Sequence, residues 1–233
     1  MVVVLCMATA AQAHGERRVE FPSGERTVPV YRDSGPYELV CKEDTLARIA
    51  ASGGDFAWRL QETLRWAECM ETGHRHLQDA VDAVPARGHR ILMMPGLYQE
   101  EPSVARLHNA TPECDGLAAQ RILTYEQQVA CPNQHNTVAI FGDDPADEDI
   151  ACTWERLCDL QIEGTGLSRE DVVIDAAWNH LNAIRADRAD GFYITGVTAQ
   201  RTDFNALYIL QTDGFVIDDV LDRKSTRLNS SHT

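Results

Sequence analysis

The chain has 233 residues, of which 44% are hydrophobic and 24% are charged. This composition excludes a disordered, collagen-like or low-complexity chain and allows one domain with a sizeable core. The formal net charge is −15. Because nucleic acid and anionic membrane surfaces bind through clustered Lys and Arg, this charge disfavours both as partners.

An apolar run opens the chain and ends at Ala11-Gln12-Ala13. The pattern is typical of the apolar region and cleavage site of a secretory signal peptide, so we expect residues 1–13 to be removed on export. The basic residues that normally precede such a region are missing, and a buried strand is the alternative interpretation. No other stretch approaches the roughly 18 apolar residues of a membrane span, so we expect an extracellular protein without one.

The other end of the chain, residues 222–233, resembles translated read-through of a common sequencing adapter. The matching residues are Asp-Arg-Lys-Ser-Thr-Arg-Leu-Asn-Ser-Ser-His, and a natural polar tail is the alternative interpretation. We therefore exclude this tail from the expected fold. The natural sequence is then expected to stop near Leu221, within a domain.

Six of the seven cysteines lie outside the expected signal peptide. An even number in an exported chain indicates disulfide bonds, whereas the absence of a CxxC motif disfavours a zinc site. Sequential pairing is favoured because each pair then encloses one local segment. The expected disulfides are Cys41–Cys69, Cys114–Cys131 and Cys152–Cys158.

Residues 14–75 are expected to form a lead-in segment, extended at first and helical from Glu43 to about Met70, where apolar residues recur at three- and four-residue spacings. Residues 76–84 then predict a short amphipathic helix that ends before Pro85. An apolar run at 91–94, bounded by Gly and Pro, predicts a buried strand.

The second half of the chain is punctuated by short apolar stretches. It begins with an irregular insertion at residues 102–136, in which 117–129 predicts a helical piece. Strands as short as those that follow are typical of an all-β solenoid or a sandwich. The expected strands lie at 137–142, 160–164, 172–175, 192–194, 207–209 and 215–217.

An internal repeat favours the solenoid. The segment from Asn182 to Val197 aligns without a gap with the segment from Asn205 to Val220, at an offset of 23 residues. Such a period suits one turn of three short strands stacked on the next turn. We expect Gly191 and Gly214 to form turns, and four pairs to form inward apolar ladders: Ile184/Leu207, Phe192/Phe215, Ile194/Ile217 and Val197/Val220.

The pattern Leu-Gln-x-Ala-Val-Asp-Ala-Val, followed by Ile-Leu-x-x-Pro-Gly-x-Tyr-x-Glu, resembles the N-terminal cap and first coil of right-handed parallel β-helix proteins with the pectin-lyase-like fold. The resemblance covers residues 76–221 and is to uncharacterised secreted proteins of actinobacterial type. It implies an all-β, right-handed parallel β-helix, a solenoid whose N-terminal α-helical cap covers the open end. In that fold the Pro95-Gly96-x-Tyr98 segment is a turn that leaves the first strand.

Several residues of the repeat could carry chemistry. The period places Asp190 under Asp213 and His180 under Asp203. Stacked carboxylates could bind Ca²⁺ or share a proton, and His180 could act as an oriented base. Arg185, like Arg188 and Arg201, could stabilise charge. Turn chemistry of Asp-Gly and a solvated surface are the favoured alternatives.

Two further features could bind a ligand. The acidic run that includes Asp143 and Asp147 could chelate calcium, although a solvated loop is the favoured alternative. Trp154, Trp178 and neighbouring His180 could stack on sugar rings, with core packing as the alternative. His74 and His76 are spaced like metal ligands but lack a third, and we assign them to the cap surface.

The β-helix resemblance implies binding or modification of an extracellular polysaccharide, by a lyase-, hydrolase- or epimerase-like protein. Proteins that share a fold often differ in function, so this implication rests on the resemblance alone. The negative charge favours a neutral glycan, or one bridged by Ca²⁺. The alternative is a non-catalytic cell-envelope or adhesion scaffold. We also expect self-association through the strand edge that a truncated solenoid would expose.

Overall fold

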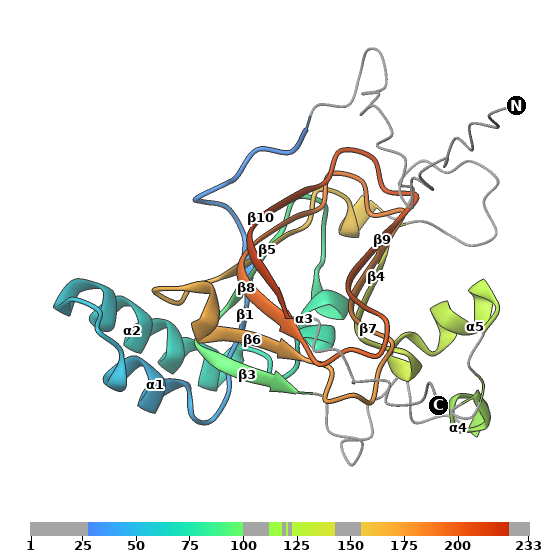
Figure 1. Ribbon diagram of the computed structural model, residues 1–233. Coiled ribbons are helices and arrows are strands. Elements are labelled where there is room, and N and C mark those ends of the chain that lie inside the picture. Colours follow the sequence, from blue (N-terminus) through green and yellow to red (C-terminus); the bar gives the residue numbers. More distant parts are fainter. Residues whose placement is uncertain (1–27, 100–111, 118–119, 121–122, 143–154, 224–233) are drawn as a thin grey trace, which may run out of the picture.

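The computed structural model describes residues 28–99, 112–117, 120, 123–142 and 155–223. Strands predominate in this part of the chain, and helices are few and mostly short (Figure 1). The strands are β1 Tyr37–Val40, β2 Arg90–Met93, β3 Gly96–Gln99, β4 Asn136–Phe141, β5 Gln161–Gly164, β6 Val172–Asp175, β7 Asn182–Asp187, β8 Tyr193–Gln200, β9 Asn205–Leu210 and β10 Val216–Arg223. The helices are α1 Thr45–Ala51, α2 Phe56–Thr72, α3 Leu77–Ala83, α4 Pro112–Leu117 and α5 Tyr125–Ala130, with short 3₁₀ turns η1 Pro132–Gln134, η2 Glu155–Leu157 and η3 Arg169–Asp171.

All strand pairs of the described residues are parallel, and they form two sheets. The first sheet has the order β1-β2-β5-β8-β6-β3, with β10 also paired to β8, and the second has the order β4-β7-β9. The long strand β8 pairs with β5 through its first half and with β6 through its second half. In Figure 1 the two sheets face each other, α1 and α2 lie beside the first, and α4 and α5 lie beside the second.

The register confirms the 23-residue repeat. Tyr193 of β8 pairs with Val216 of β10, and Asn182 of β7 pairs with Asn205 of β9. Parallel strands align equivalent side chains, so residues at this offset stack in columns. Gly191 and Gly214 have φ angles of +76° and +64°, the left-handed conformation expected of turn glycines.

Three of the four expected apolar ladders appear in the strand register, but their last members are not all buried. Ile184 pairs with Leu207, Ile194 with Ile217 and Val197 with Val220. The earlier member of each ladder is buried, and Leu207 and Val220 pack partly against the core. Phe215 and Ile217 are about 45% and 44% exposed, since β10 is paired on one side only within the described residues.

The main core lies between the two sheets and the helix α3. Leu77, Ala80, Val81 and Val84 contribute one face of the helical segment to it, as the amphipathic pattern predicted. The strand residues in this core alternate with outward-facing ones. They include Ile91, Met93, Val138, Ile140, Ile162, Ile174, Ile184, Ile194 and Val197.

Several sequence expectations differ from the structure. Gly96–Gln99 is not a turn but strand β3, which pairs with β6. The helical piece expected at 117–129 is confirmed only over its last residues, where α5 begins at Tyr125, and α4 ends at Leu117. Strand β1 lies in the expected lead-in and pairs with β2, so that segment contributes to the first sheet. At the other end, β10 continues through Asp222 and Arg223 of the expected tail.

Two of the expected disulfides are present among the described cysteines. Cys41 is bonded to Cys69 across 28 residues, and Cys114 is bonded to Cys131 across 17. Cys158 is buried and disulfide-bonded, whereas Cys152, its expected partner, lies outside the described residues. The expected signal peptide, residues 1–13, also lies outside them, as do residues 224–233 of the tail.

None of the described helices combines the length and apolar character that a membrane crossing requires.

Candidate functional site

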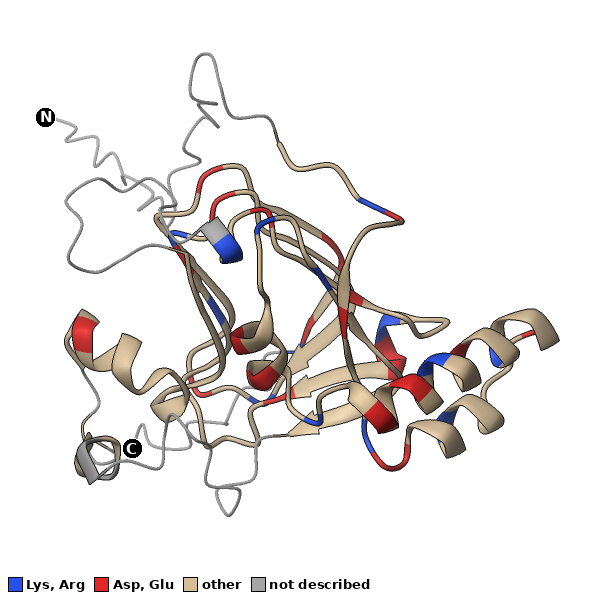
Figure 2. Cartoon of the chain, turned by 180° about the vertical axis from the view of Figure 1, so that it is seen from behind, with Lys and Arg blue, Asp and Glu red and all other residues tan. Residues whose placement is uncertain are grey.

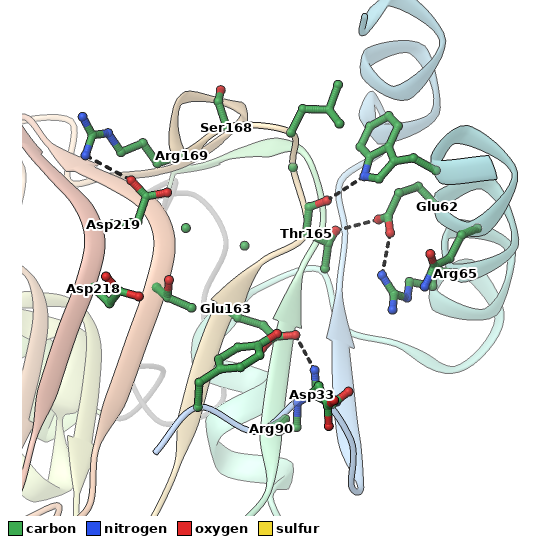
Figure 3. A pocket seen from close by; sticks show the side chains of 18 of the residues that line it. Asp33, Glu62, Arg65, Arg90, Glu163, Thr165, Ser168, Arg169, Asp218 and Asp219 are labelled. Carbon is green, nitrogen blue, oxygen red and sulfur yellow. Dashed lines mark hydrogen bonds and ion pairs between the residues drawn. The ribbon is translucent and has the colours of Figure 1, made fainter. Parts of the chain in front are cut away.

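A groove of about 620 Å³ lies between helix α2 and the face of the first sheet that points away from the core (Figure 3). Its volume falls within the range of about 300–1,000 Å³ that is usual for small-molecule sites. Strands β2, β5, β8 and β10 form its floor, with the turn after β5 and residues before β1 at its margins. The polar and aromatic lining residues are Tyr31, Asp33, Trp58, Gln61, Glu62, Arg65, Arg90, Glu163, Thr165, Ser168, Arg169, Tyr193, Thr195, Asp218 and Asp219.

Strand alternation explains why these side chains face the groove. Successive side chains of a strand point to opposite faces, so Ile162 and Ile194 enter the core while their neighbours point outward. Glu163 of β5 and Tyr193 and Thr195 of β8 therefore lie on the groove floor. Asp218 continues the same face on β10.

The floor contains a buried ion pair. The guanidinium of Arg90 donates to the carboxylate of Glu163, and the two side chains are only 6% and 10% exposed. The amide of Gln161 donates to the second oxygen of the same carboxylate. Arg90 also donates to the carbonyl oxygen of Asp33, at 3.1 Å. These bonds hold Glu163 rigidly and neutralise its charge.

The wall formed by α2 is fastened to the sheet through Glu62. Its carboxylate is 1% exposed and accepts from Arg65 Nη1 and from Thr165 Oγ1, each at 2.6 Å (Figure 3). The indole Nε1 of Trp58 donates to the carbonyl oxygen of Thr165 at 3.2 Å. The disulfide of Cys69 ties the later turns of α2 to the end of β1. Helix α2 thus holds a fixed distance from the turn after β5.

On the opposite side, the groove ends at β10. Arg169 Nη1 lies 3.1 Å from Asp219 Oδ1, and the hydroxyl of Tyr193 donates to Asp218 Oδ2 at 3.3 Å. Asp218 and Asp219 are exposed. This side is therefore more open to solvent than the Arg90–Glu163 floor.

Two tyrosine rings lie side by side in the groove. The ring centroids of Tyr31 and Tyr193 are 5.9 Å apart at an interplanar angle of 57°. Burial, and the nearby carboxylate of Glu163, raise the pKa of Tyr31 above its usual value. Burial and Asp218 likewise raise the pKa of Tyr193. Both phenols are therefore protonated at neutral pH, and Tyr193 donates a hydrogen bond to Asp218.

The lining has a net negative charge. Its three guanidiniums, on Arg65, Arg90 and Arg169, each pair with a carboxylate of the lining. Figure 2 shows the resulting neighbouring blue and red segments on α2 and the adjacent strands. Within the described residues, the side-chain carboxylates of Asp33 and Asp218 form no ion pair with these guanidiniums, so their two negative charges are not neutralised.

The structure brings Asp190 and Asp213 together, but as parts of a turn. The backbone amide of Asp213 donates to Asp190 Oδ1 at 2.7 Å, and Gly191 N donates to Asp213 O at 2.9 Å. Asp190 is buried and Asp213 is exposed. This arrangement matches the Asp-Gly turn interpretation, in which a carboxylate satisfies backbone amides.

His180 and Asp203 are neighbours through their backbones. The amide of Asp203 donates to the carbonyl oxygen of His180 at 3.1 Å. A ring nitrogen of His180, Nδ1, lies 3.1 Å from the hydroxyl of Thr137, which orients the ring toward β4. The stacking that the repeat predicted is present, and both residues lie outside the groove lining.

The arginines of the repeat are bound within the protein. Arg185 is 5% exposed, lies 2.6 Å from Asp187 and packs beside the ring of Tyr208. Arg201 forms a bidentate contact with the buried carboxylate of Asp175, and that hydrogen bond raises its pKa. Both are structural side chains, because their guanidiniums are committed to these partners.

Arg188 has the same character. Its Nε donates to Gln211 at 2.9 Å, and its guanidinium lies 4.9 Å from the ring centre of Tyr125. His74, assigned to the cap surface, lies 3.0 Å from Glu38 and is partly buried. Trp178 has a φ of +63°, and its amide donates to Arg201 O.

Within the described residues, no three His, Cys, Asp or Glu side chains are placed to hold a metal ion. Asp143 and Asp147 of the acidic run, and Trp154, lie outside those residues. Calcium binding by the acidic run therefore stays a prediction.

No match is found among protein-family models, curated proteins or solved structures. The groove is therefore the feature of the molecule that indicates a function.

Sequence reasoning did not find the groove, because its residues come from segments that are far apart in the chain. Tyr31 and Trp58 precede the repeat, Glu163 lies before it, and Tyr193 belongs to it. A usable signal was the alternation in Gln161-Ile162-Glu163 and in Tyr193-Ile194-Thr195, which places polar side chains on the outer face.

Proposed function

We propose that the two sheets are sides of a right-handed parallel β-helix. The register supports this fold: equivalent residues of β7 and β9, and of β8 and β10, are both offset by 23 residues. Strands β2, β5, β8 and β10 occur in this order along the chain, with other strands between them, and they lie side by side in the same order. Strands β4, β7 and β9 do the same in the second sheet.

We propose that the protein binds an extracellular polysaccharide in the groove. The observation that carries this proposal is the exposed ring of Tyr31, which packs on the buried ring of Tyr193 over a floor of rigid polar groups. Aromatic faces pack against the C–H groups of sugars, and phenol and carboxylate groups bond to sugar hydroxyls. The disulfides are compatible with an oxidising, extracellular setting.

The charge of the groove favours an uncharged glycan. A uronate would need a free cationic partner, and the lining arginines Arg65, Arg90 and Arg169 are engaged with carboxylates. The remaining charges of Asp33 and Asp218 would repel a polyanion. A neutral polysaccharide avoids both costs.

Polysaccharide cleavage is the second candidate. It is favoured by Asp218, an exposed carboxylate that accepts a hydrogen bond from Tyr193 at the edge of the groove. A carboxylate beside a protonated phenol can take part in acid–base chemistry. The buried carboxylates Glu62 and Glu163 are committed to arginine partners and suit a structural role. Binding without turnover is therefore the preferred form of the proposal.

Pull-down on insoluble cellulose and xylan, with polygalacturonate and alginate gels as anionic comparisons, tests this function. We expect retention on a neutral polymer, and a weakening of about tenfold for Tyr31→Ala. Tyr37→Ala is the matched control, because Tyr37 is a partly exposed tyrosine of the same sheet that does not line the groove. Retention on the anionic gels alone, or equal losses for both variants, would contradict the proposal.

The same samples distinguish binding from cleavage. Release of reducing sugars or of unsaturated products by the wild type, abolished by Asp218→Asn, would establish the enzymatic form. Retention without product release would establish the binding form.

A further inference from the structure

A second cavity adjoins the groove. It measures about 250 Å³ and is lined by Arg48, Ala51, Ser52, Trp58, Pro95, Glu170 and Asp171. Trp58 lines both cavities. Its indole is therefore the partition between the groove on the sheet and a smaller pocket beside α1.

Trp58 is held in one position by contacts on several sides. Its Nε1 donates to Thr165 O at 3.2 Å, and its backbone amide donates to the side chain of Asp55 at 2.8 Å. Gly54 lies so close to the ring that a Cβ at this position would overlap it. The indole also packs against the buried cluster around the Cys41–Cys69 disulfide. An aromatic surface fixed in this way binds a ring with little loss of side-chain entropy.

The short turn η3 is the second element that the two cavities share. Arg169 lines the groove, whereas the next two residues, Glu170 and Asp171, line the second cavity. The turn is rigid, because Asp171 and Ser168 form a reciprocal capping box and Thr198 donates to Arg169 O at 2.9 Å. The two cavities are thus neighbouring parts of one preformed surface.

The second cavity is polar and suits a neutral, hydroxylated ligand. Arg48 forms an ion pair with Asp44 at 2.7 Å, which leaves its remaining N–H groups as donors. Glu170 and Asp171 supply carboxylate acceptors in the same lining. Donors and acceptors around a flat aromatic ring are the groups that a sugar with its hydroxyls would contact.

We propose that the second cavity is a further sugar subsite, and that the bound glycan runs past Trp58 from the groove into it. The bound species is then an oligosaccharide stretch that occupies both cavities, with one ring against Tyr31 and another against Trp58. This inference rests on the proposed polysaccharide function, and it adds a dependence on chain length to it.

Calorimetric titration with linear β-1,4-linked gluco- and xylo-oligosaccharides of increasing length tests the inference. We expect affinity to rise with length, then level off once both cavities are filled, with a gain of about tenfold over the shortest binding oligomer. Ala51→Phe fills the second cavity and is expected to remove this gain while leaving the affinity for the short oligomer unchanged.

Ala57→Phe is the matched control. It makes the same substitution at an exposed position of α2 that lines neither cavity, and we expect it to bind every oligomer like the wild type. Because Trp58 packs against a core cluster, the stability of Trp58→Phe is first compared with that of the wild type by thermal unfolding. We expect this variant to weaken long oligomers more than short ones, since only the long ones place a ring against Trp58.

The outcomes separate the two proposals. Affinity independent of length, or a gain that survives in Ala51→Phe, would overturn the second subsite while groove binding stands. Failure of every oligomer in both series to bind, with cellulose and xylan also not retained, would overturn the polysaccharide function and the subsite with it.

Discussion

The guanidinium of Arg90 donates to the carboxylate of Glu163 between the neighbouring parallel strands β2 and β5. Both side chains are nearly buried, and Gln161 donates to the remaining carboxylate oxygen. The pair links the start of the first sheet to the floor of the groove. It therefore couples the stability of the fold to the shape of the candidate site.

Removing one partner of this pair leaves the other as a buried, uncompensated charge. We expect Glu163→Gln to lower the free energy of unfolding by about 3 kcal/mol, since breaking a buried pair typically costs about 3–5 kcal/mol. Replacing both residues with leucine should cost less. Urea denaturation of the two variants measures the difference, and a double variant less stable than Glu163→Gln would contradict this interpretation.

Close backbone packing at Gly164 predicts a second effect. A Cβ on Gly164 would overlap the carbonyl oxygen of Gly196, and both residues line the groove. We expect Gly164→Ala to destabilise the fold by about 1–3 kcal/mol, because β5 and β8 must move apart. Gly53→Ala is the control, since nothing lies within 4 Å of the added methyl group. Equal thermal midpoints for the two variants would refute the packing argument.

His135 predicts a dependence of stability on pH. Burial lowers the pKa of this histidine below its usual value of 6.5, and its carbonyl oxygen accepts the amides of Leu181 and Asn182. The unfolded chain then binds the proton more readily than the folded one. The contribution of His135 to stability is therefore fully present above about pH 6.5 and lost as the pH falls through its lowered pKa.

The variant His135→Gln cannot gain this proton. Denaturant unfolding between about pH 7.5 and about pH 5 should show a smaller loss of stability for His135→Gln than for the wild type. The difference between the two slopes isolates His135 from the carboxylates, which titrate in both proteins. Parallel slopes would show that His135 takes no part.

The edge of β10 predicts self-association. Phe215 and Ile217 are exposed there, and β10 is paired only with β8 within the described residues. An unpaired strand edge with apolar side chains is a template for another chain. In sedimentation velocity, we expect Ile217→Lys to show a larger fraction of monomer than the wild type. Thr212→Lys, a polar position in the preceding turn, is the comparison, and equal behaviour of both variants would exclude the edge.

Much of the fold was predictable from local patterns. The strand Val172–Asp175 and the 23-residue register follow from short apolar runs and a gapless repeat, and the structure contains both. Strand β3 was missed because Pro95 and Gly96 signal a turn, whereas pairing with β6 recruits the residues after them into the sheet. Tertiary pairing overrode local propensity at this position.

The site was far less predictable. The repeat pointed to Asp190 and Asp213, but the structure places them in a turn. It also pointed to Arg185, whose guanidinium forms a buried ion pair with Asp187. The groove instead depends on Trp58, which belongs to a segment outside the repeat. Its place beside the turn after β5 is set by the Cys41–Cys69 disulfide and by Glu62, relationships that no local spacing encodes.

A crystal structure of the protein with a bound xylo- or cello-oligosaccharide tests the central claim most directly. The proposal predicts sugar density in the groove, with one ring against Tyr31 and hydroxyls bonded to Asp218 or Thr195. Density that continues to Trp58 would also support the second subsite. Sugar bound elsewhere, with the groove filled only by water at saturating oligosaccharide, would contradict the claim.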